Sequence, residues 1–225
     1  MAGGGLFARL KAAAAEDWHA YCHHRFVAGI ADGSLPEAAF RHYLVQDYLF
    51  LIQFARAYAL AAFKADGIAD MRSAAAVLQA ILDVEMQLHL DHCATWGLDE
   101  HDMAAAPEAL ETTAYTRFVL DCGQRGDALD LAAALAPCVV GYGEIGRRLA
   151  ADPATVGRGN RYASWIETYA GAAYQEVAGA AVAQLDRLWA ARGSDARLKP
   201  LARLFAQATR LECAFWDMGW RAGAG

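Results

Sequence analysis

The sequence predicts an all-α protein, a single helical bundle formed by residues 1–225. Apolar residues recur at the helical period along nearly the whole chain, and no segment shows the polar–apolar alternation of a strand. Glycine, proline and aspartate mark short connections between the periodic segments, and no repeat or low-complexity linker divides the chain. These features are typical of a bundle with short loops whose centre can hold a ligand pocket.

Three helices are expected in the first half of the chain. The first covers residues 6–23 and ends before the turn GIADGSLPEA. Ser34 and Glu37 in this turn have the spacing of a capping box around a proline, so the second helix is expected over residues 36–65. The third covers residues 69–96, and the glycine that follows is its C-terminal signal.

Four more helices are expected in the second half. A loop with a proline leads to a helix over residues 113–124, and a Gly-Asp pair separates it from the next helix, over residues 127–150. An Asp-Pro pair and two glycines form the following loop. A helix over residues 163–192 is expected to weaken near Gly171, and a Gly-Ser pair separates it from the last helix, over residues 195–220.

Composition excludes several classes of function. The net charge is -6 and the basic residues are scattered, so a nucleic-acid partner is not expected. Hydrophobic residues make up 56% of the chain, but much of this is alanine, and no 18-residue run is uninterrupted, so no membrane span is expected. The N-terminal segment lacks the order of a secretory signal. Five cysteines without a CxxC pair indicate a reduced, cytoplasmic protein.

Two carboxylates stand where the helical period demands an apolar residue. Asp47 lies within the apolar stripe of the second helix, and Glu212 lies among aromatic residues of the last helix. A buried carboxylate must be paired, hydrogen-bonded or protonated. An arginine partner, such as Arg56 for Asp47, would give either residue a purely structural role. A carboxyl group held among aromatic rings would instead have a raised pKa and could act as an acid.

The stretch LAPCVVGYGEIG places a thiol inside a helix that is rich in glycine. Cys138 and Tyr142 are one turn apart, and a lone buried cysteine is most often a small apolar residue. Inward aromatic residues on other helices, together with the thiol and the two carboxylates, describe a pocket for a flat, nitrogen-rich ring. Gly141 and Gly143 are expected to leave room for that ring.

A second polar cluster, Glu85, His89 and His92, lies on one face of the third predicted helix. The three side chains have a spacing that metal ligands can use, and Glu144 could join them. A polar network that holds helices together explains the same pattern, and we favour it.

Six stretches of the chain together match one known family. They are FVAGIADGSLPEAAFRHYLVQDYLFL, EMQLH, AYTRF, APCVVGYGEIG, WIETYAG and ECAFWDMGW, and they span nearly the whole chain. The chain thus resembles the TenA family, also called thiaminase II or aminopyrimidine aminohydrolase, in its cysteine-containing type. The resemblance implies a heme-oxygenase-like helical fold. It also implies a hydrolase of thiamin salvage that converts 4-amino-5-aminomethyl-2-methylpyrimidine, or thiamin, to the hydroxymethylpyrimidine.

The resemblance implies a chemical role for three residues. Cys138, which follows a proline, would be the nucleophile, Glu212 the acid and base, and Asp47 of the Gln-Asp pair the residue that binds the aminopyrimidine edge. Addition of sulfur to the electron-poor ring, with protonation of the ring, lets the group on the methylene leave, after which water adds. This chemistry requires no metal and no organic cofactor.

The resemblance also implies the aromatic walls of the pocket. Phe50 and Tyr142 would stack on the ring, Tyr115 would lie near the nucleophile, and Tyr169 near the acid. Small residues follow Cys138 and Tyr169 where many relatives have bulky ones, so the shape of the pocket is open at this stage.

The resemblance implies a homotetramer and leaves two alternative functions. A di-iron oxidase of the same fold would use Glu85, His92 and Glu144, but Tyr169 and Ala173 stand where its third helix needs a histidine and an acid. A non-catalytic aminopyrimidine-binding protein would not need the thiol, Asp47 and Glu212 together.

Overall fold

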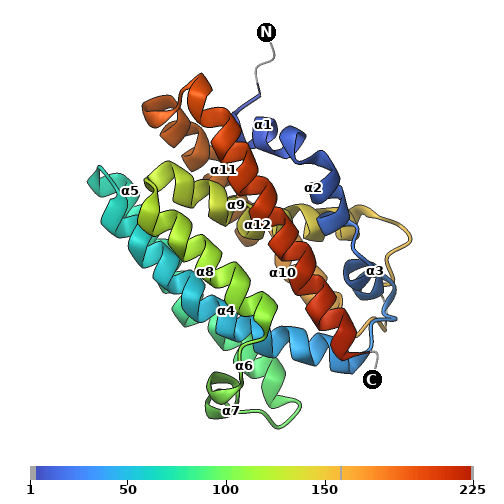
Figure 1. Cartoon of the computed structure of the whole chain (residues 1–225). Coiled ribbons are helices and arrows are strands. Elements are labelled where there is room, and N and C mark those ends of the chain that lie inside the picture. The colour runs from blue at the N-terminus through green and yellow to red at the C-terminus, as the bar shows by residue number, and fades with distance from the viewer. Residues whose placement is uncertain (1–3, 158, 224–225) are drawn as a thin grey trace.

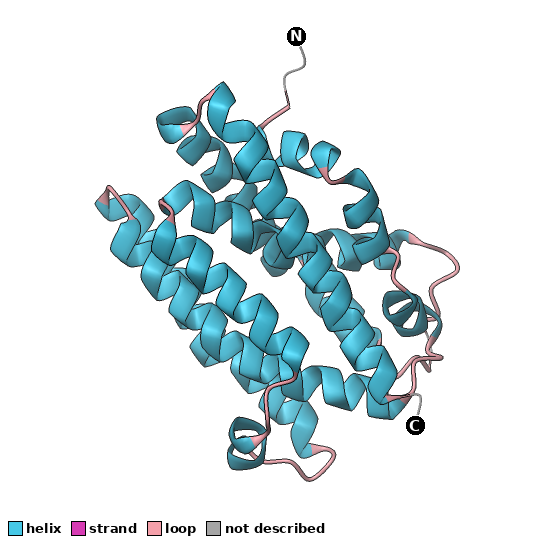
Figure 2. Ribbon diagram, viewed as in Figure 1, coloured by secondary structure: helices cyan, strands magenta, loops and turns pink. Residues whose placement is uncertain are grey.

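A computed structural model describes residues 4–157 and 159–223; the ends of the predicted single domain lie outside these ranges. Figure 2 shows helices joined by loops, and no strand occurs in the part of the chain that is described. The helices are α1 (Leu6–Ala13), α2 (Ala15–Cys22), α3 (Arg25–Asp32), α4 (Glu37–Lys64), α5 (Ile68–Ala80), the wide turn η1 (Ile81–Glu85), α6 (Met86–Ala94), α7 (Glu100–Ala105), α8 (Leu110–Arg125), α9 (Ala128–Ala151), α10 (Ala163–Ala170), α11 (Ala172–Arg192) and α12 (Asp195–Ala222). The all-α prediction is confirmed.

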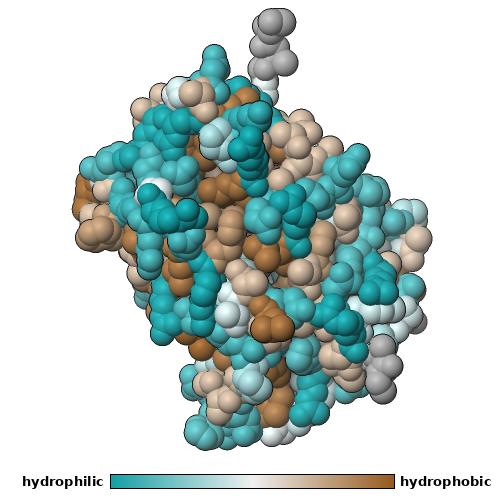
Figure 3. Space-filling view, viewed as in Figure 1, coloured by the Kyte–Doolittle hydropathy of each residue, from teal (hydrophilic) through white to brown (hydrophobic). Residues whose placement is uncertain are grey.

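Helix α9 lies at the centre of the bundle, behind α12 in the view of Figure 1. It packs against α8, α10, α11 and α12, and α4 packs against both α8 and α12. By length and composition α9 could cross a membrane, but 72% of its apolar window is buried inside the bundle. Its apolar surface therefore belongs to the protein core, while hydrophilic residues cover much of the face seen in Figure 3.

The N-terminal third differs from the sequence prediction. The first helix is interrupted at Ala14, and a further helix, α3, starts before the predicted turn and covers its first four residues. His24 caps α3 by accepting a hydrogen bond from a backbone N–H. Histidine is not among the usual cap residues Ser, Thr, Asp and Asn, so no signal in the sequence marked the start of this helix. The predicted capping box of Ser34 and Glu37 is wrong, because α4 starts after Pro36 with no side-chain cap.

Two further differences concern the connections. Helix α7, in the loop before α8, was not predicted, although Asp99 and Asp102 form a reciprocal capping box at its start. The predicted helix over residues 163–192 is divided into α10 and α11 at Gly171, where weakening was expected.

The segment α5–η1–α6 is one continuous helix with a widened turn. The Met86 N–H bonds to the carbonyl of Ile81, five residues earlier, as in a π-helix. In an ordinary α-helix four residues rotate about 40° more than a full turn, so side chains spaced by four residues point in progressively different directions around the helix axis. The wider turn offsets this rotation, so Ile81 and His89, eight residues apart, are both buried against the bundle.

The glycines of α9 allow helices to approach one another closely. A Cβ on Gly141 would overlap the ring of Tyr21 on α2, and a Cβ on Gly146 would lie 2.5 Å from the carbonyl carbon of Tyr169 on α10. At Gly143 the neighbour is Ala178, at 3.1 Å. The prediction that Gly141 and Gly143 leave room for a ring is therefore wrong, because protein atoms already fill that space.

Candidate functional site

A cavity opens beside the thiol of Cys138, between α9 and the segment α5–η1. It encloses about 440 Å³, including the space at its mouth. Its lining combines one thiol, two carboxylic acids and several aromatic rings: Asp47, Phe50, Leu51, Phe54, Val77, Ile81, Glu85, Cys138, Val139, Tyr142, Tyr169, Tyr174 and Val177. Six elements, α4, α5, η1, α9, α10 and α11, therefore contribute to one site.

Cys138 is held as a neutral thiol. Burial raises its pKa well above the ordinary value, and the charges of Glu212, Asp47 and Glu85 raise it further, in that order. The other four cysteines are free as well, but none of them lines this cavity. The position of Cys138 gives its sulfur access to a ligand, and its chemistry requires a partner that accepts the thiol proton.

Glu212 is the carboxyl group whose charge, after burial, most raises the pKa of that thiol, although it is not among the residues that line the cavity. It is 2% exposed, and burial raises its pKa to about 8, even though the hydrogen bond from Tyr115 works in the opposite direction. The hydroxyl of Tyr115 donates to Glu212 Oε1 at 2.7 Å. No arginine pairs with this carboxyl among the described residues, so the purely structural alternative of an arginine partner does not apply. Near neutral pH the group holds a proton that it can donate.

Asp47 belongs to a hydrogen-bonded pair with His89. The Nε2–H of His89 donates to Asp47 Oδ2 at 2.7 Å, and its Nδ1–H donates to the backbone carbonyl of Glu85 at 2.8 Å. Both ring nitrogens face acceptors, so the histidine is a cation. Burial alone would lower the pKa of His89, but the hydrogen bond and charge of Asp47 raise it above its ordinary value. Arg56, the expected partner, bonds to Gln53 instead.

Tyr43 supports the same carboxylate from a second direction. Its hydroxyl donates to Asp47 Oδ2 at 3.3 Å and lies 3.4 Å from the hydroxyl of Tyr142. Trp165 donates its Nε1–H to Tyr43 at 3.3 Å. These contacts fix the orientation of Asp47 while leaving its other oxygen, Oδ1, without a hydrogen bond among the described residues. That oxygen is able to accept from a ligand.

The aromatic walls come from four helices. The ring of Phe50 lies 5.0 Å from that of Tyr115, and the rings of Tyr142 and Tyr169 are 4.9 Å apart. Tyr115, expected near the nucleophile, donates a hydrogen bond to Glu212 and also lies close enough to Cys138 for the thiol to act on its pKa after burial and Glu212. Tyr169, expected near the acid, lines the cavity beside Tyr142.

Two of the residues proposed as metal ligands, His92 and Glu144, make separate contacts away from the cavity. His92 packs its ring on Phe40, at 5.4 Å between centroids, and Glu144 accepts hydrogen bonds from Lys11 and Trp18. Within residues 4–157 and 159–223, no three His, Cys, Asp or Glu side chains are grouped as metal ligands. Of the polar network that we favoured from the sequence on the third predicted helix, only His89 makes a side-chain hydrogen bond among the described residues, and its side-chain partner is Asp47.

Comparison with known proteins identifies the family. The profile of the TENA/THI-4/PQQC family matches residues 11–222. An aminopyrimidine aminohydrolase of Halalkalibacterium halodurans is 38% identical over 204 residues, which cover 90% of each chain. The chain belongs to the TENA/THI-4/PQQC family.

Solved structures of relatives agree with this TenA-type fold. A structure named as a TenA family transcription regulator, from Silicibacter sp. TM1040, is 45% identical with a TM-score of 0.91 and covers 96% of this chain and 97% of its own. A Shewanella denitrificans domain with a heme oxygenase-like fold has a TM-score of 0.74 at 14% identity, covering 96% of this chain and 92% of its own. The predicted heme-oxygenase-like bundle is confirmed.

Several residues of this TenA-family site were not singled out from the sequence. Tyr174 lines the cavity and Tyr43 bonds to Asp47, and neither residue was selected from the sequence. Glu85 and His89 were noted only as possible metal ligands or network members, whereas Glu85 lines the cavity and His89 holds Asp47. For Glu85 and His89, the available signal is their spacing of four residues from the apolar Ile81. This spacing places a carboxyl and an imidazole on the same helix face as a buried apolar side chain.

Proposed function

We propose that this protein is a hydrolase of thiamin salvage that converts 4-amino-5-aminomethyl-2-methylpyrimidine to the 5-hydroxymethyl product. The observation that carries the proposal is that the Cys138 thiol and the Asp47 carboxylate line one aromatic-walled cavity, with the protonated Glu212 buried close enough for its charge to act on that thiol. Asp47 Oδ1 would accept from the ring amine, while Phe50 and Tyr142 would hold the flat ring. The relative from Halalkalibacterium halodurans, an aminopyrimidine aminohydrolase, supports the same reaction.

The chemistry begins with addition to the ring. In the proposed reaction the Cys138 sulfur bonds to an electron-poor ring carbon while Glu212 gives its proton to a ring nitrogen. The thiol proton then passes to the Glu212 carboxylate, so no free thiolate has to exist in the acidic cavity. This order suits a thiol whose pKa is raised and an acid whose pKa is about 8.

The second half of the reaction replaces the amine by water. The electron pair of the reduced ring breaks the carbon–nitrogen bond at the methylene, and the ammonium group leaves as ammonia. Water bonds to the exposed methylene carbon, and the proton it loses is taken up by the ammonia. The carbon–sulfur bond then breaks, the ring nitrogen returns its proton to sulfur, and the aromatic ring is restored.

The test is a direct incubation with two substrates. Purified protein is given thiamin or 4-amino-5-aminomethyl-2-methylpyrimidine, and hydroxymethylpyrimidine is followed by chromatography. We expect the product from the aminomethyl compound, and its yield from thiamin reports whether a thiazole can also leave. Absence of product from both compounds would reject the proposal and favour a non-catalytic binding protein.

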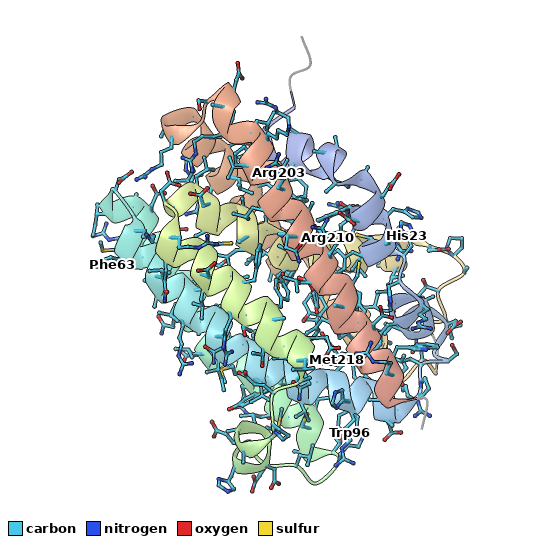
Figure 4. All side chains as sticks on the ribbon, in the orientation of Figure 1. His23, Phe63, Trp96, Arg203, Arg210 and Met218 are labelled. Carbon is cyan, nitrogen blue, oxygen red and sulfur yellow. The ribbon has the colours of Figure 1, made fainter. Side chains whose placement is uncertain are left out.

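We further propose a cytoplasmic homo-oligomer, a tetramer as the resemblance implies. The free thiols suit a reduced compartment. An apolar surface on α5, η1 and α6 supports self-association, because Met71, Leu82, Val84 and Leu88 are each at least 41% exposed. Phe63, 82% exposed, lies at the outer edge of the molecule in Figure 4. Sedimentation of the parent and of a Leu82→Glu, Leu88→Glu variant tests this, and a parent that sediments as a monomer would refute it.

A further inference from the structure

Glu85 is an acid in the cavity for which the reaction above has no use. Its side chain lines the same space as Cys138 and Asp47. Among the described residues, its carboxylate makes no hydrogen bond and no ion pair, because the contact with His89 uses the Glu85 backbone carbonyl. A carboxylate in an enclosed, largely apolar space without a partner is costly. Such a group is expected where a ligand supplies the partner.

Glu85 is partly buried against the bundle. Glu85 is the last residue of the wide turn η1, and π-type turns within helices are frequent at functional sites. The turn keeps Glu85 on the same face as the buried Ile81 and His89. An uninterrupted α-helix would rotate it progressively away from that face.

Neighbouring groups on four helices respond to the charge of Glu85. Burial is the largest cause of the raised pKa values of Tyr58 on α4, Cys138 on α9, Tyr169 on α10 and Tyr174 on α11, and the charge of Glu85 raises each of them further. Burial in turn raises the pKa of Glu85 to about 7, since the charge of nearby His89 only partly offsets it. Three of these residues, Cys138, Tyr169 and Tyr174, line the cavity together with Glu85.

The ionised side chains of the site carry more negative than positive charge when Glu85 is ionised. Asp47 and the cationic His89 neutralise each other, and Glu212 holds a proton near neutral pH. Once Glu85 ionises, the cavity carries one negative charge without a matching positive group. The cavity is thus complementary to a ligand with one positive charge.

The geometry of an aminopyrimidine places such a charge near Glu85. Asp47 would hold the ring amine, and the aminomethyl arm is attached to the neighbouring ring carbon, so the arm must lie close to Asp47. Glu85 is the other carboxylic acid that lines the cavity, and it lies close enough to Asp47 for the charge of Asp47 to add to the effect of burial on its pKa. We propose that the Glu85 carboxylate binds the ammonium of the substrate's methylene arm and so selects aminomethyl substrates over uncharged analogues. This inference rests on the proposed function, whose leaving group it specifies.

The experiment measures binding without turnover. In a Cys138→Ala background, calorimetric titration compares the aminomethylpyrimidine, which is a cation, with the hydroxymethylpyrimidine, which is neutral. Glu85→Gln keeps the size of the side chain and removes its charge. Loss of a charge-assisted hydrogen bond should weaken aminomethylpyrimidine about 10-fold or more, with a change below about 3-fold for the neutral compound. Asp83→Asn, an exposed neighbour in the same turn, is the matched control and should change neither affinity.

A second variant distinguishes the effect of the carboxylate charge from a general effect of substitution on the fold. Glu85→Asp retains the carboxylate and should keep part of the preference for the cation, while circular dichroism checks the fold of each variant. Equal weakening of both compounds by Glu85→Gln, or no weakening of the aminomethyl compound, would overturn the inference.

The outcome is separable from that of the proposed function. A parent that binds the cation through Glu85 but forms no product would support this subsite and reject the hydrolase. A parent that forms product while Glu85→Gln keeps full preference would reject the subsite alone.

Discussion

Replacing Glu212 by glutamine should change how stability depends on pH. The folded protein holds the Glu212 proton up to a pKa of about 8, whereas the unfolded chain releases it near the ordinary value of 4.5. Between these values the folded state binds more protons than the unfolded state, so the free energy of unfolding falls as pH rises. Each pH unit in this window costs about 1.4 kcal/mol from this group.

The size of the effect follows from the width of the window. Between pH 6 and pH 9, two pH units lie below the folded pKa of Glu212, which is about 8. Ionisation of Glu212 should therefore lower the free energy of unfolding of the parent by roughly 3 kcal/mol over this range. Glutamine does not ionise and can keep the hydrogen bond from Tyr115. The contribution of Glu85, which titrates near 7, is common to both proteins and cancels in the comparison. Between pH 6 and pH 9, the free energy of unfolding of Glu212→Gln should therefore fall by roughly 3 kcal/mol less than that of the parent.

Urea unfolding followed by circular dichroism at pH 6 and pH 9 measures the difference. The same variant should lose about 10²–10⁴-fold in kcat, because it can no longer protonate the ring. If the free energies of parent and variant fall in parallel between the two pH values, Glu212 does not carry a raised pKa and the assignment of the acid fails.

Three further substitutions test other parts of the site and fold. Cys138→Ser should lose nearly all turnover while Cys122→Ser keeps it, as measured by product formation; equal rates in the two variants would remove the nucleophile. Asp47→Asn should raise KM for the aminopyrimidine about 10-fold or more through loss of a charge-assisted hydrogen bond, and an unchanged KM would place recognition elsewhere. Gly146→Ala should destabilise the fold by about 1–3 kcal/mol in thermal unfolding, because its Cβ meets the Tyr169 backbone; a parental midpoint would contradict the close approach.

The sequence was most informative where a polar residue interrupts an apolar stripe. Asp47 and Glu212 could be selected in this way because burial follows from the helical period, and both are buried. Their partners could not be found by the same argument. Tyr115 reaches Glu212 from α8, and His89 reaches Asp47 from α6, and such contacts depend on how distant helices pack.

The glycines of α9 show the limit of a local argument. Their number within one helix indicated that something must lie close to its backbone. The sequence does not say whether a ligand or another helix fills that space, because Tyr21 on α2 and Tyr169 on α10 are far away along the chain. The helix α3 was missed for a related reason, since its cap is a histidine and its apolar residues pack against α12.

Hydrolysis in heavy-oxygen water tests the central claim most directly. The protein is incubated with 4-amino-5-aminomethyl-2-methylpyrimidine in H₂¹⁸O, and ammonia and the pyrimidine product are quantified, the latter by mass spectrometry. We predict equal amounts of ammonia and hydroxymethylpyrimidine, with one heavy oxygen in each product molecule and neither compound formed by Cys138→Ser. Product without heavy oxygen, or equal product from Cys138→Ser, would contradict a water-dependent reaction at this thiol.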